Sequence, residues 1–101
     1  MNKEAILKYT SLAAAQRKTV CGTDAVLDEV RKTGKKCVLL ATDASERTTK
    51  QITDKCTYYN VPLVKLDTPM DDLGKRVGKG PTAAVAVTLP NLVKEILKLV
   101  D

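Results

Sequence analysis

The stretch that decides the fold is residues 36–42, Lys-Cys-Val-Leu-Leu-Ala-Thr, which is apolar at five successive positions. A strand with one face in water alternates polar with apolar residues, whereas a strand covered on both faces is apolar throughout. We therefore expect a central strand with helices above and below it. Asp43, followed by Glu46 three residues later, has the spacing of a capping box, so this strand is expected to lead straight into a helix.

The segments on either side alternate between helical and strand-like patterns. Apolar residues at steps of three and four predict helices, and short Val- or Leu-rich runs predict strands. Gly34 is expected to end the second helix, and Thr68 to provide the N-cap of the fourth. The third helix is expected to bury Ile52, Cys56 and Tyr59. Helices are expected at about 2–15, 23–32, 45–60, 69–77 and from 90 onward, and strands at 17–22, 36–42, 63–66 and 82–88.

These elements predict an α/β protein with one domain over residues 1–101. At this length a chain buries enough surface to fold without a metal or disulfide. The alternation of helix and strand is that of a single three-layer α/β/α sandwich, and we expect its central mixed sheet to have about four strands.

The cysteines and the absence of histidine limit the chemistry of the chain. Cys21, Cys37 and Cys56 are an odd number without Cys-x-x-Cys spacing, and no histidine is present to complete a zinc site. We expect reduced, structural thiols, no metal and no cofactor. No apolar run approaches the ~20 residues of a membrane span, and no signal-peptide pattern opens the chain. A cytoplasmic protein with no membrane partner is expected, as a monomer when free.

Catalytic motifs are missing as well. The sequence has no Gly-x-Ser-x-Gly, His-Glu-x-x-His or Walker lysine motif, and the glycines of residues 74–81 do not have phosphate-loop spacing. We therefore expect no catalytic residues and no enzymatic activity.

The charge points instead to a polyanionic partner. The formal net charge is +5, and most of the basic pairs flank glycine-containing loops. Gly22, Thr23 and Asp24 come where a strand ends and a helix begins, so they present backbone N–H groups suited to a phosphate or a base edge. Lys79, Gly80 and Pro81 form a second tight loop. The alternative is that these are ordinary turn glycines and solubilising lysines.

Several motifs resemble those of the ribosomal protein L7Ae/L30e family, and of its bacterial YlxQ-like members most of all. They are the Gly-Thr-Asp after the first strand, Val-Leu-Leu-Ala-Thr-Asp-Ala-Ser at 38–45, Ile-Thr-Asp-Lys-Cys-Thr-Tyr-Tyr-Asn-Val-Pro at 52–62 and Leu-Gly-Lys at 73–75. The resemblance covers nearly the whole chain. It implies an α/β/α sandwich that binds kink-turns or related internal loops of structured RNA, ribosomal RNA included. The segments that the resemblance implies for RNA binding are residues 22–28 and 78–82.

One departure from the family pattern bears on which RNA is bound. The kink-turn-binding members carry Gly-x-Asn-Glu-x-x-Lys, where the Asn and Glu contact base edges and the Lys contacts phosphate. The matching positions here are Asp24, Ala25 and Asp28. Losing a phosphate-contacting lysine weakens RNA affinity, so we expect weaker kink-turn readout here than in those members. A protein-interaction module on the same fold that has lost kink-turn readout is therefore the alternative function, with ribosomal or RNA-processing proteins as candidate partners.

From charge, loop geometry and resemblance together, we predict one RNA-binding surface. Its residues are Arg17, Lys18, Gly22, Thr23, Asp24, Arg31, Lys32, Lys79, Gly80 and Pro81.

Overall fold

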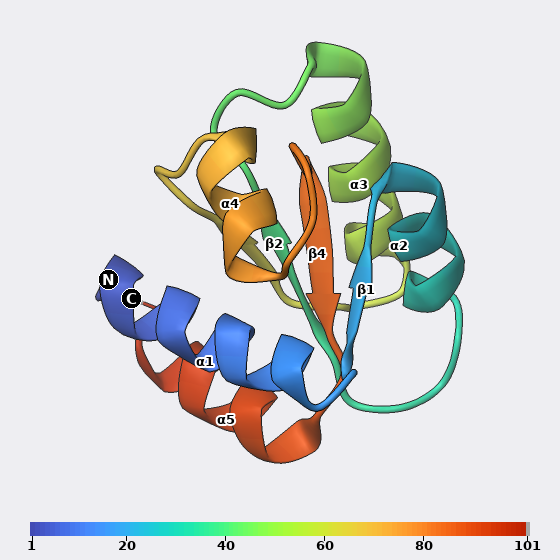
Figure 1. Cartoon of the computed structure of the whole chain (residues 1–101). Coiled ribbons are helices and arrows are strands. Elements are labelled where there is room, and N and C mark those ends of the chain that lie inside the picture. Colours follow the sequence, from blue (N-terminus) through green and yellow to red (C-terminus); the bar gives the residue numbers. More distant parts are fainter. Residues whose placement is uncertain (101) are drawn as a thin grey trace.

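The computed structural model describes residues 1–100, which form five helices around a four-stranded sheet (Figure 1). The helices are α1 (Lys3–Ala15), α2 (Thr23–Val30), α3 (Glu46–Tyr58), α4 (Met70–Arg76) and α5 (Pro90–Lys98). The strands are β1 (Thr19–Cys21), β2 (Cys37–Leu40), β3 (Leu63–Lys65) and β4 (Ala84–Val87). Every predicted element is present, and the strands are shorter than their apolar patterns suggested. No helix in this part of the chain has the length and apolar character needed to cross a membrane.

The sheet is mixed, with the strand order β1-β4-β2-β3. β2 runs parallel to β3 and antiparallel to β4, which in turn pairs antiparallel with β1. The register places Leu39 beside Val64 on one side and Val85 on the other. β2 and β4 are therefore the two inner strands, and all the residues of both are buried.

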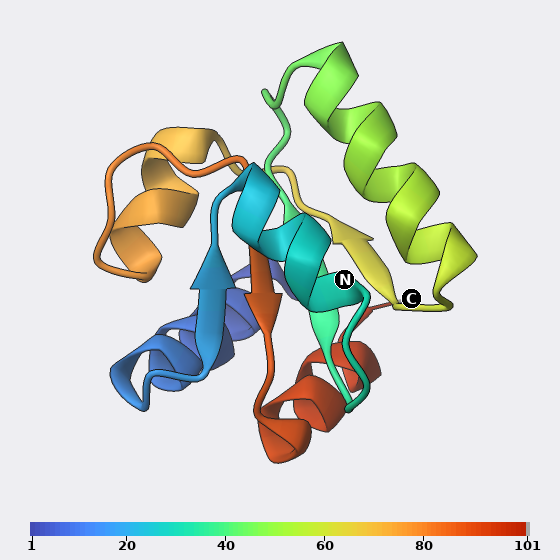
Figure 2. The ribbon, with the colours of Figure 1, turned by 90° about the vertical axis from the view of Figure 1, so that its right-hand side faces the viewer.

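Helices cover both faces of the sheet, as the unbroken apolar run of β2 requires (Figures 1 and 2). Successive side chains of a strand point to opposite faces. Leu39 and Val85 thus join one core with α1, α4 and α5, whereas Leu40 and Ala86 join a second core with α2 and α3. The predicted three-layer sandwich is confirmed, with a separate core on each side of the sheet.

Two predicted helix caps are wrong, those by Asp43 on α3 and by Thr68 on α4. Ser45, not Asp43, caps α3, since its hydroxyl accepts a hydrogen bond from the amide of Thr48 at 3.1 Å. The Asp43 carboxylate instead accepts from the amide of Met70 at 2.8 Å and so caps α4. Thr68 is buried, and its hydroxyl has no hydrogen-bond partner among residues 1–100. The contact between Asp43 and Met70, 27 positions apart, thus takes Asp43 away from α3 and provides the acceptor that Thr68 was expected to give α4.

Two other local predictions also differ from the structure. α2 ends at Val30 with Arg31 as its C-cap, so Gly34 lies in the turn beyond the helix, where its φ of +115° suits glycine. Ile52 and Cys56 are buried as predicted, but Tyr59 follows the end of α3 and is 39% exposed. The Tyr59 ring meets the Tyr58 ring edge to face, with centroids 4.8 Å apart.

Candidate functional site

The loop before β4, the edge strand β1 and the end of α1 surround a hollow of about 560 Å³. We call it the glycine hollow, because three glycines of its wall have no other chain segment over them. A Cβ built on Gly22, Gly78 or Gly80 would meet no heavy atom within 4 Å. Backbone groups at these points are therefore open to close approach by a ligand. The lining residues are Ala14, Arg17, Thr19, Cys21, Gly22, Val77, Gly78, Lys79, Gly80, Pro81 and Thr82.

Gly22 turns the chain from β1 into α2 at one side of this hollow. Its φ of +97° is one that side chains with a Cβ rarely adopt, which explains glycine at this position. The amide of Gly22 donates to the carbonyl of Ala84 at 3.0 Å, so this turn is fixed to the first residue of β4. No side chain caps α2, and the amides of its first turn have no acceptor within the helix. These amides are free to bind an anion.

The loop at residues 78–82 forms the opposite wall and is held against α4. The Lys79 amide donates to the Gly74 carbonyl at 2.8 Å, and the Thr82 amide donates to the Met70 carbonyl at 3.1 Å. The Thr82 hydroxyl also donates to the Gly80 carbonyl at 2.8 Å. Gly74 permits this packing, because a Cβ there would collide with the carbonyl group of Gly80. The loop therefore has a defined shape before any ligand arrives.

Two cations line the glycine hollow, one from each side. Arg17 follows α1 and is exposed, with a φ of +58°. Lys79 projects from the opposite loop and is also exposed. Neither makes an ion pair among the described residues. The hollow thus combines positive charge with accessible backbone, which together suit a phosphate backbone and the bases it carries.

The predicted surface residues are only partly brought together. Arg17, Gly22, Lys79, Gly80 and Pro81 line the hollow, and Thr23 and Asp24 begin α2 immediately beside it. Arg17 and Gly22 reach the hollow from the two ends of β1, which lies between them.

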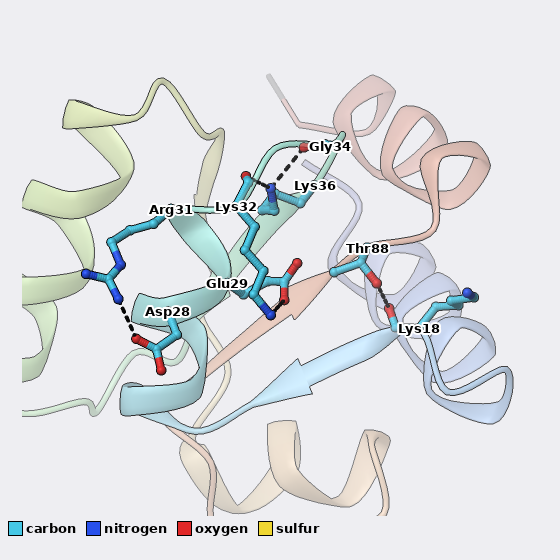
Figure 3. A network of polar contacts seen from close by, with 8 residues as sticks. All are labelled: Lys18, Asp28, Glu29, Arg31, Lys32, Gly34, Lys36 and Thr88. Carbon is cyan, nitrogen blue, oxygen red and sulfur yellow. Dashed lines mark hydrogen bonds and ion pairs between the residues drawn. The ribbon is translucent and has the colours of Figure 1, made fainter.

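Lys18 is at the far end of β1 from Gly22. Its carbonyl accepts from the amide of Thr88 at 2.9 Å and from the Thr88 hydroxyl at 3.1 Å (Figure 3). Lys18 does not line the hollow.

Arg31 and Lys32 lie beyond the opposite end of α2, a helix of eight residues that rises about 12 Å. Arg31 pairs with Asp28 at 3.1 Å, and Lys32 pairs with Glu29 at 3.6 Å (Figure 3). The structure therefore separates these two residues from the glycine hollow.

The three positions that depart from the family pattern are all exposed on α2. Asp24 and Ala25 belong to its first turn, beside the hollow. Asp28 lies one turn further along and is engaged by Arg31. A carboxylate at 24 can accept a hydrogen bond but cannot donate one, and alanine at 25 can do neither.

Sequence reasoning missed two kinds of contribution to the hollow. Thr19 and Cys21 alternate along β1 and both line it. An alternating pattern over only three residues is too short to predict which side chains of a strand share a face. Gly74 was visible as a glycine inside a predicted helix, which signals a packing role. Its contact with Gly80 could not be predicted from the sequence.

Cys37 and Cys56, one in each core, are poor nucleophiles because they are buried. Burial raises the pKa of the Cys37 thiol to about 12 and that of Cys56 to about 11. Cys21 is half-buried, and all three thiols are free in the structure. Within residues 1–100, no three Cys, Asp or Glu side chains lie close enough to hold a metal ion. The expected absence of cofactors stays a prediction.

Two RNA-binding proteins of known sequence match this chain over nearly its whole length. The RNA-binding protein YlxQ of Bacillus subtilis is 42% identical over 90 residues, which cover 89% of each chain. The protein of the same name from Enterococcus faecium is 27% identical over 99% of this chain and 95% of its own.

Two solved structures share the fold. A Bacillus halodurans protein of unknown function has a TM-score of 0.85 at 26% identity and covers 93% of this chain and 94% of its own. The Giardia lamblia 15.5kD RNA binding protein has a TM-score of 0.78 at 22% identity, over 93% and 82% of the two chains. The family model described as the ribosomal protein L7Ae/L30e/S12e/Gadd45 family matches residues 4–97. This chain therefore belongs to that family, as its motifs had indicated.

Proposed function

We propose that this protein binds structured RNA through the glycine hollow and the adjoining first turn of α2. The observation that carries the proposal is the union of open backbone at Gly22, Gly78 and Gly80 with the cations Arg17 and Lys79. The B. subtilis and E. faecium relatives, both named RNA-binding proteins, support it.

Each part of the hollow has a role in this proposal. Lys79 and Arg17 neutralise phosphates, and the amides of residues 23–25 donate hydrogen bonds to a phosphate or a base edge at the positive end of the helix dipole. The absence of side chains at the glycines lets a nucleotide lie against the backbone. The proposed function is binding, and we assign no catalytic step to any residue. We place the protein in the cytoplasm, with ribosomal RNA as the first candidate ligand.

The RNA preferred by this chain is, on our proposal, an internal loop other than the standard kink-turn. Asp24 can accept a hydrogen bond from a guanine amino group, but Ala25 offers no polar atom and Asp28 repels phosphate. Lys18, Arg31 and Lys32 have no part in this site, since they lie away from the hollow.

The test compares labelled RNAs of equal length: a kink-turn, a symmetric internal loop and a plain duplex. Lys79→Ala should weaken binding to all three and lower the slope of log affinity against log salt by about one unit, as expected for one lost phosphate contact. Lys94→Ala is the matched control, because Lys94 is exposed on α5 and does not line the hollow. Equal loss of affinity in both variants would contradict the site.

Two further variants separate backbone approach from charge. Gly22→Val should weaken RNA binding at every salt concentration, because it fills the open backbone position and strains a φ of +97°. Its unfolding must be measured alongside, so that lost affinity is not mistaken for lost fold. The triple variant Asp24→Asn, Ala25→Glu, Asp28→Lys should gain affinity for the kink-turn more than for the duplex.

A second candidate function is favoured by one observation, the acidic character of α2 next to the hollow. Asp24, Asp28 and Glu29 all lie on this helix and would repel an RNA backbone. A protein-binding module would show an RNA salt slope near zero, and Lys79→Ala would then have no effect on it.

A further inference from the structure

A second groove lies where α2 and α3 end, on the side of the molecule away from the glycine hollow. It encloses about 540 Å³, a volume typical of sites for small ligands or single side chains. We call it the α2–α5 groove. Its floor is apolar and comes from three parts of the chain, which are α2, the segment after α3, and α5. The floor residues are Val30, Tyr59, Val61, Pro62, Val93 and Leu97.

The rim of this groove is positively charged. Arg31, Lys32 and Lys35 are exposed along it, and none of the residues that line the groove is acidic. The carboxylates paired with Arg31 and Lys32 are Asp28 and Glu29, one turn back on α2. Lys35 has no ion-pair partner within residues 1–100.

The pairs formed by Arg31 and Lys32 do not remove these cations from use. The Arg31 and Lys32 side chains are 54% and 68% exposed, and exposed pairs of this kind contribute little to stability. Exchanging Asp28 or Glu29 for a carboxylate of a partner therefore costs little.

The rim is held in place by Lys36, whose side chain is used inside the protein. Its ammonium group donates to the Lys32 carbonyl at 2.7 Å and to the Gly34 carbonyl at 2.9 Å (Figure 3). Lys36 is only 4% exposed, so it holds the turn that follows α2 from within. Arg31, Lys32 and Lys35 take no part in these two hydrogen bonds.

The floor favours an aliphatic side chain over a nucleotide base. Tyr59 is the aromatic residue of the floor, and the Lys55 ammonium lies 5.9 Å from its ring centroid, while the Tyr58 ring packs edge to face against it. The ring is thus already engaged by two neighbours. The rest of the floor is Val, Leu and Pro, which pack against methyl groups and do not stack on bases.

We propose that the α2–α5 groove binds a short acidic peptide segment of a partner protein, with one or two aliphatic side chains on the floor and carboxylates on the rim cations. A contact of this size is smaller than a standard protein interface, so a micromolar affinity is expected. The groove and the glycine hollow lie at opposite ends of α2, so the peptide leaves the hollow free.

The probe is a fluorescein-labelled peptide of alternating Glu and Leu, titrated against the full chain and followed by anisotropy and by amide chemical shifts. Saturable binding with shifts confined to residues 30–36, 59–62 and 93–97 is the expected result. A matched peptide with Ser in place of Leu keeps the charge and should bind at least tenfold more weakly. An oligouridine of equal charge should not shift these residues.

The variant that tests the rim is Lys35→Glu, a change of an exposed residue outside any helix or strand. It should weaken the Glu-Leu peptide by tenfold or more, whereas Lys8→Glu, the same charge change on the exposed face of α1, should stay within about twofold. RNA affinity measured on both variants shows whether the glycine hollow is unaffected.

Three outcomes would overturn the proposal. One is the absence of saturable chemical-shift changes at about 1 mM peptide, a concentration far above the micromolar dissociation constant expected. Another is equal binding of the Leu and Ser peptides, which would mean that only net charge is recognised. The third is oligouridine shifting the same residues, which would make the groove a second RNA surface.

Discussion

Replacing Gly74 by alanine should disable the glycine hollow from a distance, because Gly74 lies under the loop that forms one wall. The added Cβ would collide with the Gly80 carbonyl oxygen and lie 2.7 Å from its carbonyl carbon, so the loop must move. Overpacking of this kind costs about 1–3 kcal/mol. Loss of the Lys79–Gly74 hydrogen bond adds roughly 1 kcal/mol, and the better helix propensity of alanine returns about the same amount. The free energy of unfolding should therefore fall by about 1–3 kcal/mol.

Urea unfolding followed by circular dichroism measures this change, and RNA anisotropy on the folded variant measures the effect on binding. Gly80→Ala is the matched control, since a Cβ there meets nothing within 4 Å. Its unfolding free energy should stay within about 0.5 kcal/mol of the wild type. A Gly74→Ala variant as stable as the wild type and with unchanged RNA affinity would refute the claim that close packing of α4 shapes the loop.

Three further changes test the core, a cap and a buried thiol. Leu39→Ala should lower the unfolding free energy by about 2–5 kcal/mol, because Leu39 is fully buried between two strands, and a loss below about 1 kcal/mol in urea would contradict this. Asp43→Ala should cost about 0.5–2 kcal/mol by uncapping α4 at the Met70 amide, and Asp43→Asn, which keeps an acceptor oxygen, should recover most of that. Burial raises the pKa of Cys37 to about 12, so the unfolded chain loses that proton first as the pH rises. Stability should then fall above about pH 8.5, by up to about 1.4 kcal/mol per pH unit, and less steeply in Cys37→Ala over the same urea series.

The architecture could be predicted because its strongest signals are local. Five successive apolar residues at 37–41 indicate a strand buried on both faces, and that is the environment of β2. The caps could not be predicted in the same way. Asp43 has the right neighbours to cap α3, but its carboxylate reaches an amide 27 residues away, and only the three-dimensional fold brings the two together.

The glycine-containing loops of the candidate site could be predicted from the sequence, but the distances between its residues in the fold could not. Gly22 and Gly80 line one hollow, as the two-loop prediction required. Arg31 and Lys32 were added to it for their charge, although α2 separates them from Gly22 along its whole length. The rise of a helix per residue was enough to exclude them. Gly74 was visible as a glycine inside a predicted helix, but the segment that packs against it could be known only from the fold.

The strand order has a consequence for the sequence of events in folding. β1 is hydrogen-bonded to β4 alone in the sheet, and β4 is the last strand of the chain. During synthesis, residues 19–21 therefore have no strand to pair with until residues 84–87 have emerged, and pairing over such a separation is slow because a long loop must close first. The same step fixes Gly22 to Ala84 and brings the two walls of the glycine hollow together. A nascent or truncated chain that lacks β4 would thus have neither a finished sheet nor the hollow, so the capacity to bind a ligand there reports that folding is complete.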